Sequence, residues 1–64
     1  MSDLGRAKVA GALAASAAEE AVEFCQAGKL REVIDSIDEA EAHLRTMRRC
    51  LSRQLPAQKG QEPQ

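Results

Sequence analysis

The sequence has no Trp or Tyr, and Phe24 is its single aromatic residue. Because strands favour aromatic and β-branched residues, this composition argues against a β-sheet. The shortage of aromatic rings also removes the stacking surfaces on which proteins usually hold single-stranded nucleic acid. Nine basic and ten acidic side chains give a formal net charge of -1, so the chain as a whole does not attract a polyanion.

Ligands and nucleophiles are also scarce, with two cysteines and one histidine. They supply neither the disulfide framework of a small secreted domain nor a complete structural zinc site. Glu39, His43 and Cys50 can share one flank of a helix, but a solvated histidine beside a carboxylate explains the same residues, and we expect no metal. The sequence has no nucleophile–base spacing and no glycine-rich phosphate loop, so we expect neither enzyme activity nor a cofactor.

A long apolar run is missing as well. The alanine-rich stretch after Lys8 is free of charge only over residues 9–18, whereas a membrane-spanning helix needs about 20 apolar residues. We therefore expect no membrane insertion. Arg6 and Lys8 precede this run and an A-x-A-like site ends it at Ala17, which is the pattern of an export signal. The run contains little leucine, so we expect a cytoplasmic protein and keep export as the alternative.

What remains is a composition of strong helix formers, and it predicts an all-α hairpin. Ser2 or Asp3 can cap a first helix over about residues 3–26, and Gly28 suits the left-handed residue that ends a helix. The second helix is expected over about 29–55, before Pro56. Residues 1–55 would form the hairpin, and 56–64 a disordered polar tail. One continuous helix through Gly28 is the alternative, because a single glycine costs only about 1 kcal/mol.

Apolar periodicity predicts how the two helices pack. The second segment carries a bulky stripe, the Leu/Ile ridge, made of Leu30, Ile34, Ile37, Leu44, Met47 and Leu51, with Val33 and Ala40 beside it. The first carries a matching stripe of small side chains with three larger ones at Leu4, Leu13 and Phe24. We predict that the ridge packs against this alanine face in an antiparallel hairpin. The residues expected to carry packing and self-association are Leu13, Ala17, Ala21, Phe24, Leu30, Ile34, Ile37, Leu44, Met47 and Leu51.

Chain length and charge together predict a homodimer. A chain of 64 residues buries only about 60% of its unfolded surface, so a lone fold would be marginal. The turn end of the hairpin is acidic and the open end basic, so two hairpins laid head to tail would pair opposite charges in an antiparallel four-helix bundle. The alternative is that these charges only solvate exposed faces. In the head-to-tail dimer, Cys25 and the Cys50 of the other chain come to one end, so an intersubunit disulfide is a further alternative to two free thiols.

The basic run RTMRRCLSR offers the strongest binding candidate, with Arg45, Arg48, Arg49 and Arg53 near the end of the second helix. These arginines can complement the helix dipole or the dimer contact, or they can grip phosphates. The sequence therefore predicts a small non-enzymatic regulatory or adaptor protein whose partners are itself and an unidentified protein. The alternative function is a nucleic-acid-binding regulator that uses the arginine face of the second helix to contact RNA.

Two resemblances accompany this interpretation. The stretch GKLREVIDSIDEA looks like the second helix of a tetratricopeptide repeat, with Gly28 at the turn and Val33, Ile37 and Ala40 at packing positions. This resemblance covers half a repeat unit and implies a helix–turn–helix. In length and layout the chain is also similar to small plasmid RNA-loop-binding hairpins that dimerise into four-helix bundles, which implies RNA binding as the alternative function without assigning residues.

Overall fold

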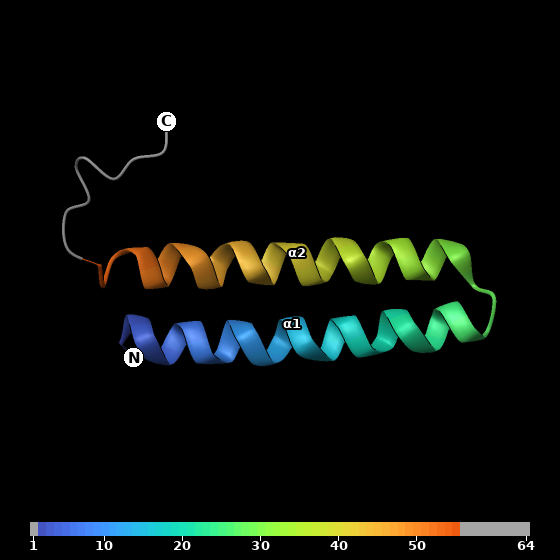
Figure 1. Cartoon of the computed structure of the whole chain (residues 1–64), viewed down its shortest axis with the longest axis horizontal. Helices are drawn as coiled ribbons and strands as arrows, with labels where there is room; N and C mark the ends of the chain where they lie inside the picture. The colour runs from blue at the N-terminus through green and yellow to red at the C-terminus, as the bar shows by residue number, and fades with distance from the viewer. Residues whose placement is uncertain (1, 56–64) are drawn as a thin grey trace, which may run out of the picture.

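The computed structural model describes residues 2–55, which form two antiparallel helices and no strands (Figure 1). The helix α1 spans Asp3–Gln26 and α2 spans Leu30–Ser52. The all-helical hairpin predicted from the sequence is confirmed, and a continuous helix through Gly28 is excluded. The expected disordered tail, residues 56–64, lies outside the described residues.

Local chemistry fixes both ends of α1. Ser2 has extended backbone, and its side-chain oxygen accepts a hydrogen bond from the Gly5 N–H at 3.0 Å, so one orphan donor of the first turn is satisfied. At the other end Gly28 has φ 76°, a left-handed conformation that L side chains rarely adopt. The Lys29 N–H then donates to the Phe24 carbonyl at 2.9 Å, which closes the turn and starts the chain back along α1.

The second helix is shorter than the expected 29–55. It begins one residue later, and Lys29 makes no side-chain cap, although its carbonyl accepts from the Val33 N–H at 3.1 Å. Beyond Ser52 the backbone tightens, because the N–H groups of Gln54 and Leu55 donate to carbonyls only three residues back, at 2.9 and 3.2 Å. Such bonds are typical of the last turn of a helix, and α2 therefore ends before Pro56 is reached.

A single line of buried side chains joins the two helices, and we call it the hairpin seam. Its α1 members are Ala7, Ala10, Ala14 and Ala17, which are buried, followed by half-buried Ala21 and Phe24. Its α2 members, buried or half-buried, are Val33, Ser36, Ala40, His43, Met47 and Cys50. Both sets alternate in steps of three and four residues, the pattern of a coiled-coil contact. Alanine at these positions lets the two backbones approach closely.

The Leu/Ile ridge does not cover the alanine face within the chain, contrary to the sequence prediction. Leu30, Ile34 and Leu44 remain 69%, 59% and 52% exposed, Ile37 is exposed too, and only Met47 and Leu51 are half-buried. The stripe that faces α1 is the adjacent one, displaced by about 100° around α2. The small alanines of α1 pack closely against this neighbouring stripe because it consists of small and medium side chains. The bulky ridge therefore faces solvent beside the contact between the helices.

Candidate functional site

The exposed ridge belongs to a continuous apolar face on one side of the hairpin. Consecutive helical residues are rotated by about 100°, so the residues that follow the seam positions all point sideways. Because α1 and α2 run in opposite directions, they point to the same side from both helices. This apolar face consists of Leu4, Gly11, Ala15, Ala18, Val22 and Cys25 from the first helix, and Leu30, Ile34, Ile37, Leu44, Leu51 and Leu55 from the second helix and the turn after it.

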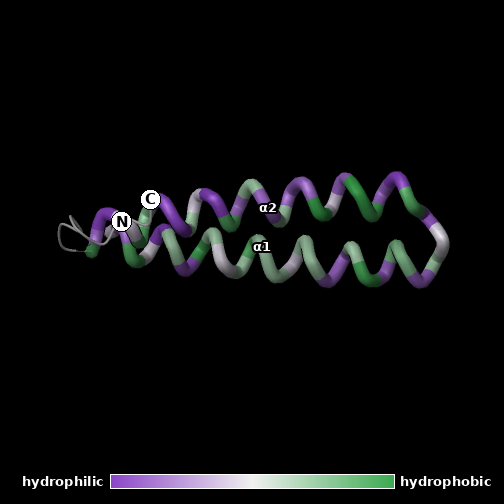
Figure 2. Tube along the Cα trace, turned by 45° about the horizontal axis from the view of Figure 1, so that its top comes forward, coloured by the Kyte–Doolittle hydropathy of each residue, from purple (hydrophilic) through white to green (hydrophobic). Residues whose placement is uncertain are grey.

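Charge is sparse on the apolar face. Among the positions that point to this side, the charged ones are Lys8, Glu41 and Arg48. Figure 2 shows the alternation along α2, in which hydrophobic segments recur between strongly hydrophilic ones, while the middle of α1 is mostly weakly hydrophobic. Large apolar side chains left in water on one side of a small protein usually mark an interaction surface.

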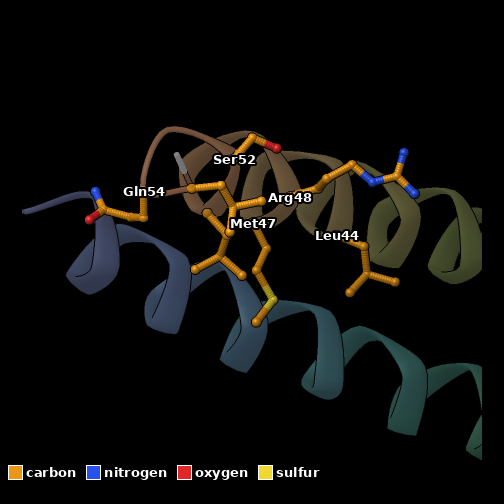
Figure 3. A pocket seen from close by; sticks show the side chains of 7 residues that line it. Leu44, Met47, Arg48, Ser52 and Gln54 are labelled. Carbon is orange, nitrogen blue, oxygen red and sulfur yellow. The ribbon is translucent and has the colours of Figure 1, made fainter. Parts of the chain in front are cut away.

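The apolar face is hollowed near the open end of the hairpin. A cavity of about 590 Å³ lies there, lined by Leu44, Met47, Arg48, Leu51, Ser52, Gln54 and Leu55 (Figure 3). Figure 3 also shows Met47 reaching from α2 toward α1, so its side chain closes the inner wall of this hollow. Near the turn, Leu30 and Ile34 protrude beside Arg31 and Asp35 around a smaller hollow of about 420 Å³. The open end of the face therefore carries the larger hollow, and the turn end carries Leu30, the most exposed large hydrophobic side chain of the face.

The opposite side of the hairpin is more polar. A hollow of about 240 Å³ lies there between Arg6, Val9 and Leu13 of α1 and His43 and Thr46 of α2, with Ala10 at its base. Leu13, expected to join the packing surface of the ridge, is 46% exposed on this side instead. The remaining positions of this side are mainly charged, and include Glu20, Glu23, Glu32, Glu39, Arg49 and Arg53.

The predicted packing residues thus fall into three groups. Ala17, Ala21, Phe24 and Met47 lie in the hairpin seam, and Leu13 lies on the polar side. The other five lie together on the apolar face: Leu30, Ile34, Ile37, Leu44 and Leu51. Sequence reasoning missed the seam residues Ser36, His43 and Cys50, whose spacing of three and four residues from Val33 to Cys50 is the signal that could have identified them.

The four predicted arginines are divided between two environments. Arg53 is held by α1, since its Nη1 donates to Asp3 Oδ1 at 3.2 Å, and Asp3 also contacts Arg6 Nη1 at 3.6 Å. Arg45, Arg48 and Arg49 are exposed and form no salt bridge within residues 2–55. Arg48 borders the apolar face and Arg45 points outward, so these side chains do not form one compact anion site.

The histidine and the cysteines do not converge. His43 Nε2 lies 3.7 Å from Glu39 Oε2, and Cys50 is buried one seam position after Met47. Within the part of the chain that the structure describes, no three His, Cys, Asp or Glu side chains are grouped so as to hold a metal ion. Cys25 is an exposed free thiol near the turn, whereas Cys50 is a buried one near the open end. An intersubunit disulfide would require Cys50 to leave the seam.

The described residues thus define an antiparallel two-helix hairpin with an alanine seam and one apolar side. No protein-family model matches the chain, and no curated protein or solved structure matches it either. Across residues 2–55, neither helix has the length and apolar character needed to cross a membrane.

Proposed function

We propose that the protein is a non-enzymatic regulatory or adaptor module that works as a homodimer, in which two hairpins bury their apolar faces in an antiparallel four-helix bundle. The observation that carries this proposal is the exposure of Leu30, Ile34 and Leu44 beside a seam built of alanine. A second hairpin presents the same surface, so a two-fold contact would cover both faces at once.

The energetics of the lone hairpin favour association. Four alanines and one cysteine are the buried apolar residues of the described chain, and alanine removes little apolar surface from water. Covering a leucine or isoleucine side chain completely contributes about 1.5–3 kcal/mol. Several such residues lie on the apolar face, so dimerisation would supply apolar burial that the seam alone does not.

The ends of the hairpin carry complementary charge. The turn end has Glu19, Glu20 and Glu23 on α1 and Glu32, Asp35 and Asp38 on α2, interrupted by Lys29 and Arg31. The open end has Arg6, Lys8, Arg45, Arg48, Arg49 and Arg53, with Asp3 among them. A head-to-tail dimer sets each acidic end beside a basic one, which favours the antiparallel arrangement over the parallel one.

We also propose that the dimer binds a protein partner and that it is cytoplasmic. A partner would meet the side that the dimer leaves open, where Val9 and Leu13 lie between Arg6 and His43. The burial of Ala14 and Ala17 in the seam supports a cytoplasmic location, because removal of an export signal after Ala17 would destroy the seam.

Sedimentation equilibrium of the full chain from low to high micromolar concentration tests the dimer. We expect a dimer, and we expect Leu44→Gln on the apolar face to weaken it by about tenfold or more, equivalent to 1.4 kcal/mol. Leu13→Gln is the matched control, because Leu13 has similar exposure on the opposite side. A monomeric wild type at high micromolar concentration rejects the proposal, as does a Leu13→Gln variant that dissociates as readily as Leu44→Gln.

RNA binding is the second candidate function, and the exposed Arg45 and Arg49, which form no salt bridge within residues 2–55, favour it. Phosphate contacts would make binding fall steeply with salt. Filter binding to a structured RNA between about 50 and 200 mM salt would detect this, and the Arg45→Glu/Arg49→Glu variant should abolish it. Absence of salt-dependent binding in the wild type rejects this alternative.

A further inference from the structure

The outer stripe of α2 has a coiled-coil spacing of its own. Taken in steps of four and three residues, it runs along the helix through Leu30, Ile34, Ile37, Glu41, Leu44, Arg48 and Leu51, and it continues to Leu55 in the turn after the helix. We call these eight positions the outer stripe. Six of them are leucine or isoleucine, as expected for a helix that packs against a second helix in addition to α1. The two exceptions, Glu41 and Arg48, carry opposite charges.

Glu41 and Arg48 form no ion pair within the single hairpin. Both are exposed, and neither forms a salt bridge among residues 2–55. They lie seven residues apart on one helix, which is too far for the pairing of neighbouring turns that stabilises isolated helices. A charged residue within an otherwise apolar helix contact commonly fixes the register and the orientation of the partner helix.

Resting on the proposed self-association, we infer that α2 packs against α2 of a second copy in antiparallel orientation, with Glu41 of each chain beside the partner's Arg48. Antiparallel stripes of this spacing pair Ile34 with the partner's Leu51, and Leu44 with the partner's Glu41. Glu41 then lies four residues from the level of the partner's Arg48, within reach of its long side chain, and three residues from the level of the partner's Glu41. The two-fold axis forms the Glu41–Arg48 pair twice and brings the two Glu41 carboxylates near each other once, so two attractions act against one repulsion.

Surface shape supports the same orientation. The hollow of about 590 Å³ at the open end is lined by Leu44, Leu51 and Leu55. In the antiparallel register the partner's Leu30 and Ile34, which are the most exposed ridge residues, arrive at this hollow. A parallel pair would instead set the two hollows against each other. It would also place Glu41 against Glu41 and Arg48 against Arg48, and like charges at a contact are unfavourable.

A charge-swap series on the full chain tests this orientation. In the antiparallel dimer, Glu41→Arg places an arginine beside the partner's Arg48, and Arg48→Glu places two carboxylates together. We expect each single variant to raise the dimer dissociation constant about tenfold, and the double variant Glu41→Arg/Arg48→Glu to restore it to within about threefold of wild type. Both sites are exposed, so the hairpin itself should keep its helical circular dichroism in every variant.

The matched control uses the outward positions Asp38 and Arg45, which have opposite charges and the same separation of seven residues. Asp38→Arg, Arg45→Glu and their combination should each change the dimer dissociation constant by less than about threefold, because these exposed charges act only through the overall charge of the hairpin ends. In a parallel dimer, Glu41 and Arg48 each face the same residue of the partner, so a single swap would only replace one pair of like charges by another. Neither single variant would then weaken the dimer. That result would overturn the antiparallel orientation while leaving the dimer itself intact. A monomeric wild type would instead overturn the proposed function on which it rests.

Discussion

The thioether end of Met47 lies against Gly11, with its Sδ and Cε atoms each 3.2 Å from the point that a Cβ on Gly11 would occupy. This separation is shorter than an ordinary van der Waals contact. The small residue on α1 therefore lets a long side chain from α2 cross the seam and form the inner wall of the hollow on the apolar face.

Gly11→Ala should stabilise the hairpin by less than about 1 kcal/mol. Alanine gains about 1 kcal/mol of helix propensity over glycine, and the flexible end of Met47 can move by the few tenths of an ångström that a methyl group needs. Urea unfolding followed by circular dichroism at matched protein concentration measures the difference. Ala12→Gly, an exposed site in the same turn, calibrates propensity alone. A destabilised Gly11→Ala variant would show that Met47 cannot move.

Ala14→Leu should destabilise the hairpin by about 1–3 kcal/mol, because three added carbon atoms must fit between closely packed helices. Ala14 is 4% exposed at the centre of the seam. Ala12→Leu supplies the control, since position 12 points outward and leucine is also a strong helix former. The same urea titration compares the two variants. Equal stability of both would mean that the alanine seam tolerates bulk and does not require close approach.

Asp3→Asn should lower the free energy of unfolding by less than about 1 kcal/mol. The carboxylate accepts from Arg53 at 3.2 Å and from Gln54 Nε2 at 3.4 Å, and it lies in the first turn of α1, where negative charge is favourable. Arg53 is itself half-exposed, and exposed ion pairs contribute about 0–1 kcal/mol.

A double-mutant cycle of Asp3→Asn with Arg53→Gln, measured by thermal unfolding at low and high salt, isolates the contact between the two helices. We expect a coupling of a few tenths of a kcal/mol that shrinks as salt is added. A zero coupling at low salt would show that Asp3 acts only through its position at the helix start.

The local features of this fold could be predicted because each depends on neighbouring residues. The sequence predicts Ser2 or Asp3 as the cap of α1 and Gly28 in a left-handed turn; the structure selects Ser2 as the cap and confirms the conformation of Gly28. The end of α2 was less predictable, since Arg53, Gln54 and Leu55 are acceptable helix residues. The tightened turn that follows Ser52 brings Gln54 and Arg53 to Asp3. Because Asp3 lies on α1, this contact depends on the packing of the two helices and not on residues close in sequence.

The sequence by itself determined that there are two helices, where they reverse and which side chains are apolar, because capping, glycine conformation and helical periodicity act within a few residues. Only the tertiary structure decided which of two adjacent stripes on α2 faces α1. Both stripes repeat every three or four residues and differ by a rotation of about 100°, so periodicity along one helix cannot separate them. The choice depends on how closely alanines allow two backbones to approach, and it leaves the bulkier stripe exposed.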